Sequence, residues 1–185
     1  MAHRVCYPMT DVPEHLIGTV TVPQGGLNVG DVVVVNTIDN TIAGNFTQYI
    51  ATQPTTELLK TEALAIVISG GNFETLSDGR LPDGQPDYTQ YAYAEGKTAP
   101  VLFLEPRVTF YLSDDCLAAA ATVNQYLYGA NASNVLAEGV AVPEDILTVV
   151  KVQAKNDFRL GGIFGGEFVK GNVCRVLPYN RVTAG

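Results

Sequence analysis

The sequence predicts a mainly β protein, a single-domain β-sandwich or a barrel-like (tulip-like) fold with one short helix and an extended N-terminal arm. Three observations predict this class. The apolar runs are short, rich in β-branched and aromatic residues, and bounded by Gly, Pro or Asp, as is typical of strands between turns. Only 16% of the residues are charged, below the ~25% usual in soluble domains, so part of the surface is expected to face another protein. A chain of 185 residues suits one domain with a full core.

The first 14 residues are predicted to form an arm that precedes a single β-rich domain over residues 15–185. Pro8 and Pro13 favour an extended rather than a helical conformation. An extended segment at a chain end is suited to lie across a neighbouring molecule. We therefore expect removal of the arm to release a partner while the domain stays folded. The residues predicted to contact that partner are Tyr7, Pro8, Met9, Val12, Pro13 and His15.

Strand patterns recur along the domain. Val32–Val35 is apolar at every position, which predicts a strand covered on both faces. Thr52–Thr56 is predicted to be a link between strands. The other strand candidates lie within Leu16–Val22, Phe46–Ala51, Ala63–Ile68, Val101–Leu104, Val108–Leu112, Asp145–Val152, Phe158–Leu160, Ile163–Phe164, Phe168–Val169 and Val173–Pro178.

One short helix is predicted over Ser113–Val123. Ser113 or Asp114 can cap its first N–H groups, and Asp115 suits the positive end of the helix dipole. The alanines that follow favour propagation of the helix.

The acidic charge balance argues against two classes of partner. The formal net charge is −8 and the few basic residues are scattered, whereas binding to nucleic acid or to an anionic membrane needs clustered Lys or Arg. No stretch has the apolar core of a signal peptide or the ~20 apolar residues of a membrane helix. We therefore expect synthesis in a cytoplasm, no direct nucleic acid partner and no membrane partner.

Metal and disulfide sites are not indicated. Asp78, Asp83 and Asp87 are spaced by five and four residues, unlike an EF-hand loop, and Arg80 lies among them, so a solvated turn cluster is favoured over a Ca²⁺ site. The three cysteines Cys6, Cys116 and Cys174 are widely spaced and odd in number, which favours free buried thiols.

No catalytic set can be assembled from the sequence. Cys116 or Asp115 would be the reactive group of a hydrolase, but His3 and His15 are far away in sequence and no base is paired with either group. The glycine-rich residues 160–166 lack the Lys-Ser/Thr pair of a phosphate-binding loop. We therefore expect no enzyme activity and no cofactor.

A series of loose motifs resembles the small head-decoration, or auxiliary capsid, proteins of tailed bacteriophages. The motifs are Gly70–Glu74, Asp78–Arg80, Asp87–Thr89, Gly96–Lys97 and Ser113–Asp115, flanked by Gly18–Pro23 near the start of the chain and Phe158–Gly162 near its end. The resemblance covers about two-thirds of the chain. It implies a β-rich cement protein on the exterior of the virion, without enzyme activity or cofactor, that binds the major capsid protein and forms a homo-oligomer.

A carbohydrate-binding adhesion module on the virion surface is the alternative. Tyr88, Tyr91 and Tyr93 would then form a stacking platform, because alternation along a strand places Tyr91 and Tyr93 on one face.

Overall fold

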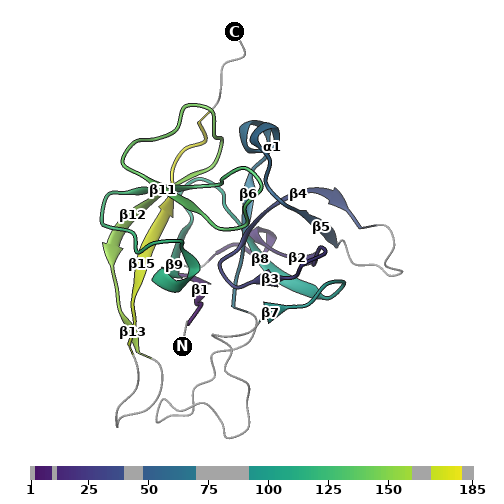
Figure 1. Ribbon diagram of the computed structural model, residues 1–185, viewed down its shortest axis with the longest axis horizontal. Helices are drawn as coiled ribbons and strands as arrows, with labels where there is room; N and C mark the ends of the chain where they lie inside the picture. Colours follow the sequence, from purple (N-terminus) through teal and green to yellow (C-terminus); the bar gives the residue numbers. More distant parts are fainter. Residues whose placement is uncertain (1–2, 10–11, 40–47, 70–91, 160–167, 181–185) are drawn as a thin grey trace, which may run out of the picture.

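Two β layers make up most of the molecule (Figure 1). The computed structural model describes residues 3–9, 12–39, 48–69, 92–159 and 168–180. Within these residues, five strands close into a barrel and six form an antiparallel sheet that packs against it. The predicted mainly β, barrel-like class is confirmed.

The barrel has one parallel and four antiparallel strand pairs. Its closed order is β2-β5-β4-β6-β8, and β2 runs parallel to β5 with Val20 opposite Tyr49. Every other neighbouring pair is antiparallel. The strands are β2 (Ile17–Thr21), β4 (Val32–Ile38), β5 (Tyr49–Thr52), β6 (Leu64–Val67) and β8 (Thr98–Phe103).

The six-stranded sheet has the order β1-β9-β15-β12-β10-β11. Its strands are β1 (Cys6–Pro8), β9 (Thr109–Ser113), β10 (Tyr126–Tyr128), β11 (Ala137–Gly139), β12 (Val149–Lys155) and β15 (Gly171–Val176). Two small sheets pair β3 (Leu27–Asn28) with β7 (Ala92–Tyr93) and β13 (Phe158–Arg159) with β14 (Phe168–Val169). Single 3-10 turns form η1 (Glu14–Leu16) and η3 (Asp114–Cys116).

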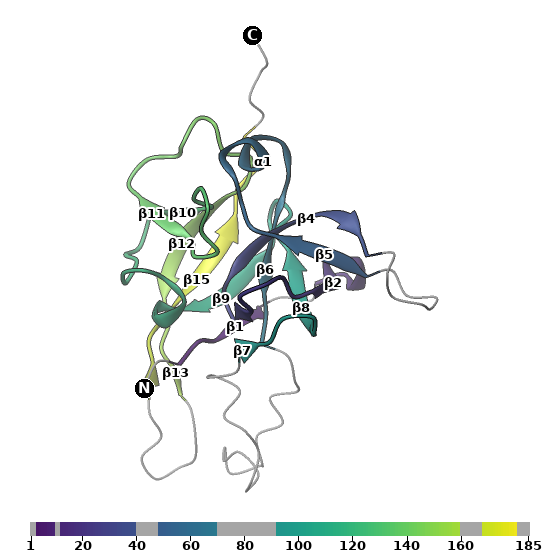
Figure 2. The same cartoon turned by 45° about the vertical axis from the view of Figure 1, so that its right-hand side comes forward.

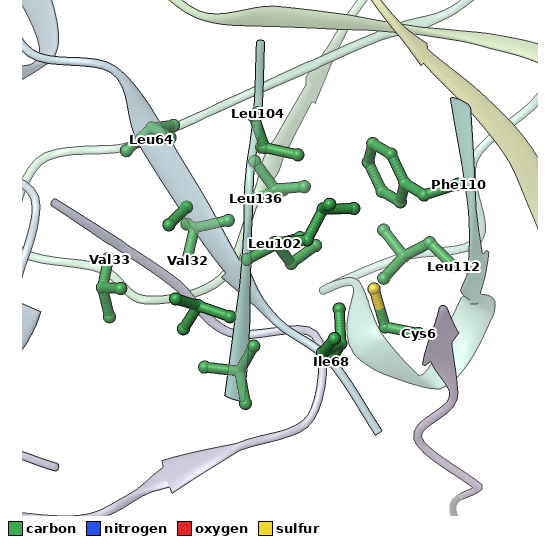
Figure 3. Packing of buried hydrophobic residues seen from close by; sticks show 14 of the residues in the cluster. Cys6, Val32, Val33, Leu64, Ile68, Leu102, Leu104, Phe110, Leu112 and Leu136 are labelled. Atoms are coloured by element: carbon green, nitrogen blue, oxygen red, sulfur yellow. The ribbon is translucent and has the colours of Figure 1, made fainter. Parts of the chain in front are cut away.

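The core fills the space between the barrel and the sheet. Leu102 and Leu104 lie across from Phe110 and Leu112 of β9 (Figure 3), and all four side chains are fully buried. Successive residues of a strand point to opposite faces, so the side chains of β4 form two rows on opposite faces of the strand. Val32–Val34 are accordingly fully buried, which confirms the prediction of a strand covered on both faces.

A glycine makes room for the aromatic side chains inside the barrel. Tyr49 and Phe103 pack edge to face with ring centroids 6.0 Å apart, a favourable geometry for two rings. A Cβ on Gly18 would lie 2.8 Å from the Phe103 ring. Glycine at this strand position therefore allows the ring of Phe103 to pack against the backbone of β2.

The N-terminal segment is part of the sheet. Tyr7 of β1 is paired with Tyr111 of β9, and Val5 is fully buried. The Arg4 guanidinium donates to Asp31 Oδ1 over 2.6 Å and thereby ties the segment to the turn that precedes β4. Burial raises the pKa of the Asp31 carboxyl, although hydrogen bonds from Asn28 and the charge of Arg4 oppose the shift. Within the segment predicted to be an extended arm, Cys6–Pro8 form a strand. Because these contacts join the segment to the rest of the fold, we expect its removal to destabilise the domain.

The prediction of a helix over Ser113–Val123 is wrong. Only the single turn Asp114–Cys116 forms, and the chain then continues without helical structure. The Lys155 ammonium donates to both carboxylate oxygens of Asp114 (2.8 and 2.9 Å) and to the carbonyl of Ala121 (2.9 Å). These tertiary bonds hold the Ala-rich segment against β12 and outweigh its helix propensity.

The α-helix lies instead at Thr56–Thr61 (α1). Thr55 Oγ1 accepts the N–H of Leu58 at 3.3 Å, and this N-cap starts the helix. Leu59 is buried against the core. Within the described residues, no helix is long and apolar enough to cross a lipid bilayer.

All three cysteines are free and buried, which confirms the sequence prediction. Burial raises the pKa of the Cys116 thiol to about 11 and that of Cys174 to about 12, and it also raises the pKa of Cys6. Thiols in an unfolded chain ionise near pH ~8.5. Because the folded pKa values are higher, the unfolded chain releases these protons first as the pH rises.

We therefore expect stability to decline in alkali. The contribution of the thiols is fully present below about pH 8.5 and is lost as the pH rises toward the folded values, at about 1.4 kcal/mol per pH unit for each thiol. Urea unfolding between pH 8 and pH 10.5 measures this slope. Cys174→Ala should make it shallower, and an unchanged slope in that variant would contradict the assignment.

Candidate interaction surfaces

The predicted partner-binding residues fall on two parts of the fold. Tyr7 is half-buried and stacks on Tyr111 with centroids 5.1 Å apart, next to half-buried Pro8 and to Met9, which is 40% exposed. The other three precede or belong to η1 beside the barrel: Val12 packs against the core, while Pro13 and His15 are exposed. The six residues therefore contact different elements.

β1 is the first strand of the six-stranded sheet, but pairing of a partner's strand with its outer edge is disfavoured. The Ser69 N–H donates to the Cys6 carbonyl at 2.8 Å, so this outward-facing acceptor already has a partner. Pro8 has no N–H to donate, and the Met9 N–H is bonded to Thr109 of β9 at 3.0 Å. A partner at this edge would have to use side chains, chiefly those of Tyr7 and Met9.

A second candidate surface lies at the opposite end of the six-stranded sheet, beside β10 and β11. Tyr126 pairs with Gly139, so the chain entering β10 and the chain leaving β11 lie at the same end of this antiparallel pair. Val123, just before β10, and Val140, directly after Gly139, belong to these two chain segments, and Val142 lies two residues beyond Val140. The three residues are 44%, 87% and 39% exposed, respectively. We call Val123, Val140, Ala141 and Val142 the apolar edge; Ala141 is also exposed.

Neighbouring structure adds apolar area to the apolar edge. The Ala119 N–H donates to Glu138 Oε1 at 3.0 Å, which brings the exposed residues Ala118–Ala120 beside β11. β11 is the last strand in the order of the sheet, and Figure 2 places it on the side of the sheet away from the barrel. The sequence prediction missed this surface. The sequence indicates this surface only through the apolar run Val140–Val142, which ends at Pro143. Such a run is equally typical of a buried strand.

A cleft of about 380 Å³ opens beside α1, within the range typical of small-molecule sites. It lies between α1, the end of β10 and residues 143–146. Its polar and aromatic lining comes from Lys60, Tyr128, Asn131, Glu144 and Asp145.

The residues considered for hydrolysis are not arranged for it. Cys116 Sγ lies 3.2 Å from Ser113 Oγ in the core, and burial raises the pKa of this thiol to about 11, whereas a nucleophilic cysteine needs a lowered pKa. The Asp115 carboxylate accepts the backbone N–H of His3 at 2.6 Å. These contacts give Cys116 and Asp115 structural roles.

The remaining predicted sites are only partly described. Asp78, Asp83 and Asp87, considered for Ca²⁺, lie outside the described residues, as do Tyr88 and Tyr91. Tyr93 is only 7% exposed and is part of the core, so the stacking platform cannot include it. Among the residues that the structure covers, no three His, Cys, Asp or Glu side chains gather to hold a metal ion.

No protein-family model, curated protein or solved structure matches this chain. The resemblance to phage decoration proteins therefore rests on its sequence motifs. Gly96–Lys97 forms the turn before β8, where Gly96 has a φ of 71°, and Ser113–Asp115 joins β9 to η3. The motifs between residues 70 and 89 lie outside the described residues.

Proposed function

We propose that this chain is a virion structural protein that decorates and stabilises the capsid exterior of a tailed bacteriophage. The apolar edge is the observation that supports a binding role most directly. Single exposed apolar residues are ordinary, but an exposed apolar group on adjacent segments marks an interaction site. The sequence motifs supply the viral context, and the proposed partner is the major capsid protein.

The energetics of docking are consistent with this proposal. Val140 is 87% exposed, and burying a valine side chain stabilises a complex by about 1.5 kcal/mol or more. Glu138 lies beside the apolar edge, and the whole chain carries a formal charge of −8. A capsid surface with apolar groups ringed by basic side chains would complement both features.

The paired substitution Val140→Asp/Val142→Asp should weaken attachment to capsids at least about tenfold, which corresponds to about 1.4 kcal/mol. Both side chains face solvent, so the fold should persist. Co-sedimentation with particles prepared without this protein measures the binding. Ile38→Asp is the matched control, because Ile38 is 50% exposed on the barrel.

Equal binding by the paired variant and the wild type would rule out the apolar edge as the attachment surface. Absence of the protein from purified particles would remove the virion proposal altogether. Light scattering of the free protein at increasing concentration tests the proposed homo-oligomer, and the same paired variant shows whether the apolar edge joins the copies.

A further inference from the structure

The cleft beside α1 is held open by bonds between its walls. The Leu147 N–H donates to the carbonyl of Leu59 at 2.8 Å, and Asn180 Nδ2 donates to the carbonyl of Pro143 at 2.8 Å. On the other side, Asn131 Oδ1 accepts the N–H of Thr56 at 3.1 Å. Each wall is anchored to a separate part of the chain, so a ligand need not order the site on binding.

The floor of the cleft is apolar and tightly packed. Leu59, Gly129 and Ile146 line it. Leu59 and Gly129 are buried, and a Cβ on Gly129 would overlap the Leu59 side chain. The absence of a side chain at Gly129 therefore lets Leu59 pack directly against this part of the backbone. Tyr128 also lines the cleft, while its hydroxyl donates to the carbonyl of Glu138 at 3.5 Å.

The rim contains hydrogen-bond donors and acceptors on facing walls. Lys60 and the Asn131 amide can donate, whereas the Glu144 and Asp145 carboxylates, both on exposed residues, can accept. A hydroxyl group both donates and accepts, so a ligand with several hydroxyls can bond to every part of this rim. The apolar floor suits the C–H face of a sugar ring.

We propose that the cleft binds a neutral saccharide unit. Lys60 already pairs with Glu57 at 3.3 Å, so little positive charge remains to attract an acidic sugar, and Glu144 and Asp145 would repel it. An arginine side chain from a partner would meet the ammonium group of Lys60 on the facing wall. The site does not depend on capsid attachment, which uses the apolar edge.

Ligand-observed NMR on the full chain tests this site with four probes: lactose, N,N′-diacetylchitobiose, digalacturonate and a tri-arginine peptide. We expect a neutral disaccharide to bind and the two charged probes to bind at least about tenfold more weakly. Ala130→Leu, which fills the cleft at a half-buried lining residue, should weaken neutral binding about tenfold. Ala119→Leu, an exposed alanine outside the cleft, should leave it unchanged.

Should Ala130→Leu fail to fold, Glu144→Gln/Asp145→Asn replaces it, because both residues are exposed and the changes are isosteric. We expect about threefold or greater weakening of neutral binding and a smaller penalty for digalacturonate. The proposal would be overturned if neither disaccharide bound, if a charged probe bound equally well or more tightly, or if the cleft variants bound the neutral disaccharide as the wild type does. Capsid attachment should be unchanged in Ala130→Leu, which separates failure of this site from failure of the capsid role.

Discussion

Removal of residues 1–8 is expected to unfold the protein or to lower its free energy of unfolding by more than about 4 kcal/mol. Val5 and Cys6 are fully buried. Cys6 packs in the main core and Val5 in a smaller cluster with Tyr111 and Val169, so the deletion removes apolar contacts from both. The deletion also removes Arg4 and leaves the 7%-exposed Asp31 side chain without its ion-pair partner. Breaking a buried pair by removing one member is strongly destabilising.

Circular dichroism with urea unfolding measures this loss. Met9→Ala is the control from the same segment, because Met9 is 40% exposed, and it should change stability by about 0.5 kcal/mol or less. A truncated protein with the wild-type unfolding midpoint would show that β1 is dispensable, and the segment would then be a detachable arm.

Gly30→Ala should lower the free energy of unfolding by about 3 kcal/mol or more. We expect this to be a large loss for the addition of one methyl group. Gly30 has a φ of 84°, a conformation that costs an alanine about 1–2 kcal/mol. Its new Cβ would also overlap the buried side chain of Cys116. Cys116 is close-packed between the carbonyls of Val5 and Val29, so overpacking adds about 1–3 kcal/mol.

Gly25→Ala is a matched control, because Gly25 has a φ of 94° but nothing within 4 Å of the position of a Cβ. Its free energy of unfolding should fall only by the cost of placing alanine in this backbone conformation, about 1–2 kcal/mol. Thermal and urea unfolding of both variants give the difference. Equal losses would show that the contact between Gly30 and Cys116 is not tight, and would contradict the packing described around η3.

The individual strands were predictable because side-chain alternation and burial are local signals. Within Val32–Val35, predicted to be covered on both faces, Val32–Val34 are fully buried and Val35 is half-buried. The closure of the barrel was not predictable, since the parallel pair Val20–Tyr49 joins strands separated by all of β4. Such a pairing depends on contacts that are distant in sequence, which the pattern of either strand does not encode.

The helix errors have two physical causes. The Ala-rich segment has high helix propensity, but Lys155 bonds to the Ala121 carbonyl and to Asp114, and tertiary bonding outweighed local preference. The real helix has only six residues. Its capping threonine, Thr55, precedes too short an apolar pattern to stand out from a loop.

The candidate surfaces were harder to predict than the fold. Val140 and Val142 have the same residue type as buried strand residues, and only the position of β11 at the end of the sheet leaves them exposed. The cleft combines α1, β10 and residues 143–146, which are distant in sequence. Tyr93 showed the opposite error, since a tyrosine expected to stack on a ligand is part of the core.

The rupture temperature of virus particles is the most direct test of the proposed cementing role. A protein that binds only the assembled shell stabilises it by mass action, by about 2.7 kcal/mol per site at a hundredfold excess over its dissociation constant. Particles prepared without this protein should therefore release their DNA at a lower temperature than complete particles. Adding back the wild-type protein should restore the rupture temperature, whereas Val140→Asp/Val142→Asp should not. Equal rupture temperatures with and without the protein would contradict the cementing role.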